Sequence, residues 1–176
     1  ERQGKTTLLL TDGATVLALF AVADSVRDTS RAAIAELHSL GIRTLMLSGD
    51  NPHTVAAIAA AVGIDEVRGD QLPEDKAAAI SAKLATAGKV GMVGDGINDA
   101  PALARADIGF AMAAAGSDTA IETADVALMD DDLRKIARFV RLSRATYQVL
   151  VQNIALALGI KVVFLVLTLG GLGTMW

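Results

Sequence analysis

Two carboxylates and an amide lie within five residues of this chain, as Asp95, Asn98 and Asp99. Residues 89–93 before them are a short apolar run that predicts a buried strand, and Pro101 suits the start of a helix because its φ is fixed and it lacks an N–H. Carboxylates between a strand and a helix lie at the sheet edge where α/β proteins bind ligands. Mg²⁺ takes one or two carboxylates with phosphate oxygens and water, so it suits this turn. Asp, Asn and Gly also dominate ordinary turns, and a turn without chemistry stays open.

A second polar group follows another apolar run. Ser48, Gly49 and Asp50 come directly after residues 44–47, which we expect to form a buried strand. A hydroxyl and neighbouring backbone N–H groups at a strand end can hold phosphate oxygens, helped by the N-terminus of the next helix. The alternative is a plain helix cap by Ser48, Asp50 or Asn51.

Lys76 lies in the first turn of a predicted helix over residues 74–87, where the helix dipole disfavours a cation. An anionic partner, either a phosphate or Asp95, would explain this position, and a solvated surface lysine is the alternative. A hydroxyl, a lysine and paired acids on successive strand–helix units together form a phosphoryl-transfer site, where positioning and charge neutralisation do most of the chemistry. Ser48 would hold the phosphoryl oxygens, Lys76 would neutralise charge, and the two acids would carry Mg²⁺.

The elements that must position these residues alternate along the chain, which predicts an α/β fold with a mostly parallel sheet. A nucleophilic aspartate on an earlier strand is needed, and Asp24 lacks the surrounding motif for that role. The expected elements are a hairpin of residues 6–10 and 15–21 around Asp12-Gly13, strands at 44–47, 89–93, 108–111 and 126–129, and helices at 29–40, 52–62, 74–87, from 101, 118–123 and 133–147.

Residues 149–169 are almost wholly apolar, about the length needed to cross a hydrocarbon core. This predicts a transmembrane helix, and a buried helix of a soluble protein is the alternative. Lys161 lies near the middle of the span, where an ionisable residue is costly and usually functional, although a lysine can also snorkel to an interface. The basic residues before the span place that side in the cytoplasm; they are Arg134, Lys135, Arg138, Arg141 and Arg144.

Composition narrows the function further. The 176 residues include no cysteine, so disulfides, thiolate metal sites and cysteine nucleophiles are excluded from this segment. The net charge is −4, without the basic patches of a nucleic-acid binder, and we expect no nucleic-acid partner. The chain starts at Glu1 without a signal peptide and stops in an apolar stretch, so we expect a fragment of a longer polypeptide.

Four motifs in order resemble the haloacid dehalogenase-like superfamily and, within it, the P-type cation-transporting ATPases. The sequences of three later segments, residues 116–118, 122–125 and 142–144, are similar to those of the heavy-metal-transporting branch of these ATPases. The four motifs are Ala23-Asp24-Ser25-Val26-Arg27, Ser48-Gly49-Asp50-Asn51, Pro73-Glu74-Asp75-Lys76 and Gly94-Asp95-Gly96-Ile97-Asn98-Asp99-Ala100-Pro101.

The resemblance implies a Rossmann-like haloacid dehalogenase-type sheet: residues 1–22 end a nucleotide-binding domain, 23–132 are part of a phosphorylation domain, and 133–176 are a linker and transmembrane helix. The missing upstream part would hold the aspartate of an Asp-Lys-Thr-Gly-Thr motif, which takes the γ-phosphoryl of ATP. The implied roles are catalysis for Ser48, Gly49, Asp50 and Lys76, Mg²⁺ binding for Asp95 and Asp99, phosphate-site support for Gly94, Gly96 and Asn98, and a hinge at Asp24 and Arg27. Ser48 departs from the usual threonine, and Asp28 from a common proline.

Lys161 is similar to the lysine of the zinc, cadmium and lead group, whereas copper pumps carry a Tyr-Asn pair of which only Asn153 is present. We therefore expect ATP-driven export of Zn²⁺, Cd²⁺ or Pb²⁺ across a bacterial plasma membrane, with Mg²⁺ and ATP as cofactors and residues 1–147 in the cytoplasm. The expected partners are the metal cation, the lipid membrane and the rest of the polypeptide. The alternatives are a soluble Mg²⁺-dependent phosphatase and a non-catalytic regulatory module. The fragment alone is expected to be inactive.

Overall fold

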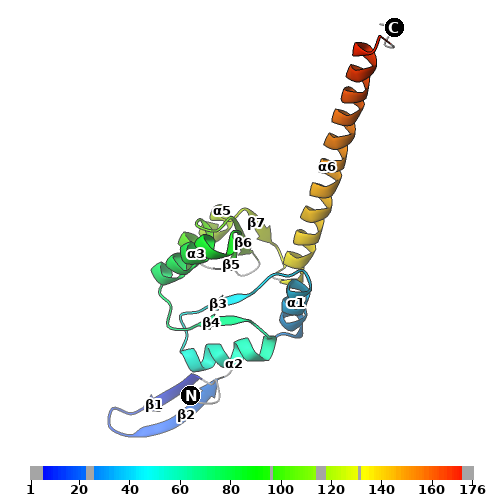
Figure 1. Ribbon diagram of the computed structural model, residues 1–176. Helices are drawn as coiled ribbons and strands as arrows, with labels where there is room; N and C mark the ends of the chain where they lie inside the picture. The colour runs from blue at the N-terminus through cyan, green and yellow to red at the C-terminus, as the bar shows by residue number, and fades with distance from the viewer. Residues whose placement is uncertain (1–5, 23–25, 96, 114–117, 131, 172–176) are drawn as a thin grey trace. The chain divides into compact units, whose positions relative to one another are not determined.

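The computed structural model describes residues 6–22, 26–95, 97–113, 118–130 and 132–171. The chain divides into two compact units, residues 1–135 and 136–176. The first element is an antiparallel hairpin of β1 (Thr6–Thr11) and β2 (Val16–Val22), drawn in blue in Figure 1. Its apolar side chains are exposed on both faces, Leu8 and Leu9 at 55% and 63%. A lone hairpin is marginal in water, so this one needs further partners.

The following strands are parallel, as the alternation of strands and helices predicts. They form two sheets, with strand orders β3-β4 and β5-β6-β7 (Figure 1). Among the described residues, β3 and β5 each pair along one edge. The elements are α1 (Asp28–Ser39), β3 (Leu45–Leu47), α2 (Pro52–Val62), β4 (Glu66–Arg68), α3 (Pro73–Ala87), β5 (Gly91–Gly94), the 3₁₀ turn η1 (Ile97–Asp99), α4 (Ala100–Leu103), β6 (Ile108–Met112), α5 (Asp118–Thr123) and β7 (Val126–Leu128).

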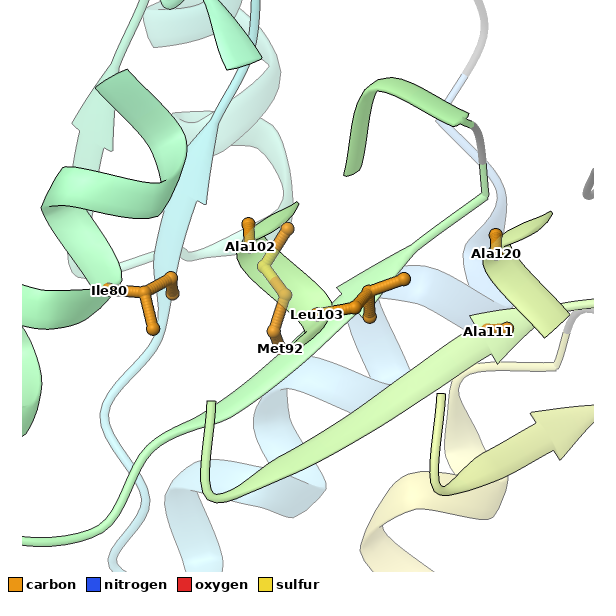
Figure 2. Packing of buried hydrophobic residues seen from close by; sticks show 6 residues of the cluster. All are labelled: Ile80, Met92, Ala102, Leu103, Ala111 and Ala120. Carbon is orange, nitrogen blue, oxygen red and sulfur yellow. The ribbon is translucent and has the colours of Figure 1, made fainter. Parts of the chain in front are cut away.

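One apolar cluster joins the helices to the second sheet. Met92 of β5 lies beside Ala102 and Leu103 of α4, and Ala111 of β6 lies near Ala120 of α5 (Figure 2). Leu47 of β3 packs against the same cluster, so the two sheets share a core. The six buried members are Ile80, Met92, Ala102, Leu103, Ala111 and Ala120. Three of the six are alanines, whose small side chains allow the short helices to approach the strands closely.

Three aspartates stand directly before strands, at the amino ends of the sheets. Each accepts the backbone N–H of the neighbouring parallel strand or of the residue that enters it, so each ties two strand ends together. The bonds join Asp65 to Thr44 at 2.7 Å, Asp107 to Val90 at 2.9 Å and Asp125 to Gly109 at 2.8 Å.

Two of these carboxyls have a lowered pKa. The Thr44 backbone N–H is the main cause for Asp65, with the Thr44 hydroxyl and His38 adding to it. For Asp107 the Lys89 ammonium comes first and the Val90 N–H second. All of these groups stabilise the ionised carboxylate, so protonation weakens the contacts.

The last element, α6, is one helix from Arg134 to Leu169. The sequence pattern predicts a helix over residues 133–147 and a separate apolar span, but α6 runs through both without a break. An 18-residue window within α6 has a mean hydropathy of 2.2 and no buried residue, so among the described helices this one is long and apolar enough to cross a membrane. The expected fold class is confirmed. The sequence pattern does not predict β4, because Glu66-Val67-Arg68 contains a single apolar residue.

Candidate phosphoryl-transfer site

The Ser48 loop follows the carboxyl end of β3. Ser48 Oγ donates to Asp50 Oδ2 at 2.9 Å and accepts the Asp50 N–H at 3.2 Å, which orients the hydroxyl within its own turn. Asn51 caps α2 by accepting the His53 N–H. The helix-cap alternative is therefore confirmed for Asn51, whereas Ser48 and Asp50 do not cap this helix. Gly49 and Asp50 are exposed, and Ser48 is half-buried.

Three backbone hydrogen bonds join this turn to the end of β4 and the loop between β4 and α3. The Ser48 N–H donates to the Arg68 carbonyl at 3.1 Å, the Gln71 N–H donates to the Ser48 carbonyl at 2.9 Å, and the Asp70 N–H donates to the Asp50 carbonyl at 2.9 Å. Asp70 takes a positive φ of 52° in this loop. Sequence reasoning missed this support, because backbone hydrogen bonds between two loops leave no signature in residue type.

Lys76 meets an anionic partner, as its position in the first turn of α3 predicts. Its Nζ lies 2.7 Å from Asp99 Oδ1, and the two side chains are 15% and 11% exposed. The partner is Asp99, which corrects the expectation of Asp95. Burial also excludes the solvated-lysine interpretation. Asp99 is the one buried charged residue among those described.

Glycine at position 94 lets Asp99 fold back against β5. A Cβ at Gly94 would lie 2.6 Å from Asp99 Cβ, closer than real Cβ contacts. The 3₁₀ turn η1 carries Asp99 under the strand end, while Asp95 remains exposed directly after β5. Asn98 is also exposed in this turn. The two acids are thus on one turn but in different environments.

The remaining site residues are placed only in part. Arg27 precedes α1 as its N-cap residue, and its carbonyl accepts the Ser30 N–H at 3.0 Å. Asp24, its proposed hinge partner, and Gly96 lie outside the described residues. Lys161 lies on α6, exposed among the apolar residues of that helix.

The donor set at this edge fits Mg²⁺. Asp95 and Asp99 offer carboxylate oxygens, the hard ligands that Mg²⁺ prefers, and the ion usually completes its shell with substrate phosphates and water. In the described part of the chain no three His, Asp or Glu side chains gather as a closed metal site.

The chain resembles known proteins in sequence and in fold. Residues 1–107 match the family model of haloacid dehalogenase-like hydrolases, and the chain belongs to that family. It is also 50% identical over its whole length to a probable cadmium-transporting ATPase of Staphylococcus aureus and 46% identical to a copper-exporting P-type ATPase of Staphylococcus aureus strain JH9, covering 22% of each. The expected resemblance to P-type ATPases is confirmed.

A solved structure extends the likeness to three dimensions. The crystal structure of a zinc-transporting PIB-type ATPase in the E2.Pi state matches 99% of this chain with a TM-score of 0.89 and 44% identity. The match covers 28% of that protein. The chain spans about a quarter of the length of the curated relatives it matches.

Proposed function

We propose that this chain is the part of an ATP-driven heavy-metal exporter that contains the Mg²⁺ corner of the phosphorylation site and one transmembrane helix. The observation that carries the proposal is the buried ion pair of Lys76 and Asp99 beside the exposed Asp95, at the carboxyl end of β5. The relatives named as cadmium- and zinc-transporting ATPases support the assignment.

The residues at this edge have separate tasks in the proposed reaction. Ser48 donates its hydroxyl to the phosphoryl oxygens, which requires release from Asp50 Oδ2. Lys76 holds Asp99 in place and adds positive charge beside the transferring group. Asp95 and Asp99 would hold Mg²⁺, which would supply positive charge to neutralise the transferring phosphoryl group. Gly94 keeps the space that Asp99 needs, and Gly49, Gly96 and Asn98 complete the phosphate site.

The nucleophilic aspartate belongs to a strand upstream of this chain. The parallel ladder is interrupted between β3 and β5, although Leu47 packs against the cluster that contains Met92. An added parallel strand paired with both edges would end between Ser48 and Asp95, since parallel strands share one carboxyl edge. In this domain scheme, residues 23–132 complete a phosphorylation domain and 1–22 end a nucleotide-binding domain. Asp24 and Arg27 form the hinge between these domains.

Residues 133–176 carry the linker helix and the span. We place residues 1–147 in the cytoplasm and the protein in a bacterial plasma membrane, because basic residues precede the apolar part of α6. Lys161 lies on the transport path, where its ammonium serves as a counter-ion to an acidic metal ligand of another helix. The group of substrates is Zn²⁺, Cd²⁺ and Pb²⁺. The sequence identity to a cadmium-transporting relative is 50% and that to a copper-exporting relative is 46%. These two values are too similar to distinguish the substrates.

The test is metal-stimulated ATP hydrolysis by the complete protein in lipid. We expect zinc, cadmium and lead to stimulate hydrolysis and copper to have no effect. Lys161→Ala is expected to lower zinc stimulation about tenfold or more while phosphorylation by inorganic phosphate persists. Copper stimulation alone would overturn the substrate group, and unchanged zinc stimulation in Lys161→Ala would make this lysine structural.

Assays on the isolated chain distinguish the alternative function, a soluble phosphatase, from the proposed pump. The 176-residue chain is expected to incorporate no phosphate from ATP and to hydrolyse no phosphate ester, because the nucleophile is upstream. Hydrolysis of a phosphate ester by the isolated chain, lost in Asp95→Ala, would support the phosphatase and contradict the pump fragment.

A further inference from the structure

Three arginines occupy one side of α6 before its apolar part. Arg138, Arg141 and Arg144 are exposed and follow one another at three-residue intervals. With about 3.6 residues per turn, each step rotates the side chain by about 60°, so the three share a sector of about 120°. Together they form a basic stripe on the second unit of the chain.

The stripe ends where the proposed membrane begins. At about 1.5 Å per residue, Arg144 lies about 7 Å before Val149 and Arg138 about 16 Å before it. The headgroup layer on each side of a bilayer is about 5–7 Å thick. Arg144 therefore lies at the outer edge of this layer, Arg141 lies about 5 Å beyond that edge, and Arg138 lies farther out. The exposed Tyr147 stands between the stripe and the span, where aromatic residues gather at membrane interfaces.

The charge of α6 is of one sign. From Arg134 to Leu169 the sequence contains no aspartate and no glutamate. A basic segment directly beside a transmembrane helix attracts acidic lipids, with an effect that falls off within a Debye length of about 8 Å.

We propose that Arg138, Arg141 and Arg144 bind the headgroups of anionic phospholipids in the cytoplasmic leaflet. The proposal rests on the proposed function in one respect, that α6 crosses a membrane. It goes beyond the orientation of α6 in the membrane, because it names the class of lipid that is bound. It also ranks the contributions of the arginines to lipid binding, with Arg144 the largest and Arg138 the smallest. Phosphate groups of the lipid accept hydrogen bonds from the guanidinium groups, which are well shaped for them.

The test uses the 176-residue chain in phosphatidylcholine vesicles. Because the chain has no cysteine, Ser143→Cys gives one site for a fluorescent donor within the stripe. Energy transfer is measured to an acceptor on the headgroup of either phosphatidylglycerol or phosphatidylcholine, at the same low mole fraction. We expect the anionic acceptor to be enriched about threefold to fivefold around the donor at low salt, and the enrichment to vanish in high salt.

Variants separate this role from a general charge effect. Arg144→Gln is expected to remove most of the enrichment and Arg138→Gln less than half of it. Replacing all three arginines by lysine keeps most of it. The matched control R43Q/R68Q/R105Q removes the same charge from exposed positions of the first unit and leaves the enrichment unchanged. Equal transfer to both acceptors, or equal loss in the control, would overturn the proposal.

A second label tests insertion independently. A fluorophore on Ala157→Cys, within the apolar part of α6, is quenched by lipids brominated in their acyl chains if the helix is in the bilayer. Quenching together with equal transfer to both acceptors overturns the lipid proposal and leaves the pump intact. Absence of quenching overturns both, because α6 then does not cross the membrane.

Discussion

The two ends of the parallel strands use their carboxylates differently. At the amino ends, Asp65, Asp107 and Asp125 accept backbone N–H groups and fasten strands to one another. At the carboxyl ends, Asp99 is buried against Lys76 and Asp95 is exposed after β5. Acids at the first edge tie strands together, whereas those at the second are the ones that we propose to hold a cation beside the phosphoryl group. In this proposal the same residue type has two roles, set by its position along the strand.

Two lysine–aspartate pairs make this contrast measurable. The Lys76–Asp99 pair is 15% and 11% exposed, but in the Lys89–Asp107 pair Lys89 is 88% exposed. Lys76→Met is expected to lower the free energy of unfolding by about 3 kcal/mol, because it leaves a buried carboxylate without its cation. Urea unfolding followed by the fluorine resonance of fluorophenylalanine at buried Phe110 measures the loss. A loss below about 1 kcal/mol would contradict the burial of this pair.

Gly94→Ala is the next largest change. The added methyl would overlap Asp99 Cβ, so either η1 or β5 must shift, at a cost of about 1–3 kcal/mol. Gly49→Ala is the matched control for stability, since its nearest contact is an ordinary 3.4 Å from the Gln71 carbonyl. The fluorine unfolding experiment should show little change for the control. Equal effects of both substitutions would argue against close packing of Asp99 beneath the strand.

The loss of stability at low pH tests the role of the aspartates at the amino ends of the strands. The pKa values of Asp65 and Asp107 are lowered in the folded state, so their stabilisation is full above the unfolded value of about 3.9 and is lost as the pH falls through the folded values. The paired variant Asp65→Asn/Asp107→Asn should therefore show a weaker decline in stability between about pH 4 and pH 2 than the unchanged chain. The pH series of urea midpoints measures this decline. Identical declines would show that these carboxylates contribute nothing to the acid response.

Lys89→Met should have the smallest effect. The ammonium is largely in solvent, and exposed ion pairs contribute little to stability. The Val90 N–H still bonds Asp107 after the change. We expect the urea midpoint to move by less than a fifth of the Lys76→Met shift. A shift as large as that of Lys76→Met would remove the distinction between the two edges.

Most of the candidate site was predicted from residue types alone, because the turn around Asp95 and Asp99 combines glycines, acids and a proline after a strand. The partner of Lys76 could not be predicted, since the choice of Asp99 depends on how η1 folds beneath Gly94. β4 was missed because Glu66 and Arg68 give no apolar alternation, and pairing with β3 forms the strand. The continuity of α6 was missed because composition changes near residue 148 while the backbone does not.

The amino-end aspartates were also beyond sequence reasoning. An aspartate before a strand is an ordinary loop residue until the register places a neighbouring N–H opposite it, as for Asp125 and Gly109. That register depends on packing far along the chain. Sequence patterns therefore suggested candidate residues for chemistry, but they did not indicate the residues that hold the strands together.

The most direct measurement is phosphoenzyme formation from radiolabelled ATP in the complete protein. Asp95→Asn and Asp99→Asn, at the carboxyl edge, are expected to lower Mg²⁺-dependent labelling about 100-fold or more, in the range of a lost electrostatic stabiliser. Asp107→Asn, at the opposite edge, should label within about twofold of the unchanged protein. Normal labelling in both carboxyl-edge variants, or equal loss in all three, would contradict the assignment of this edge as the phosphorylation site.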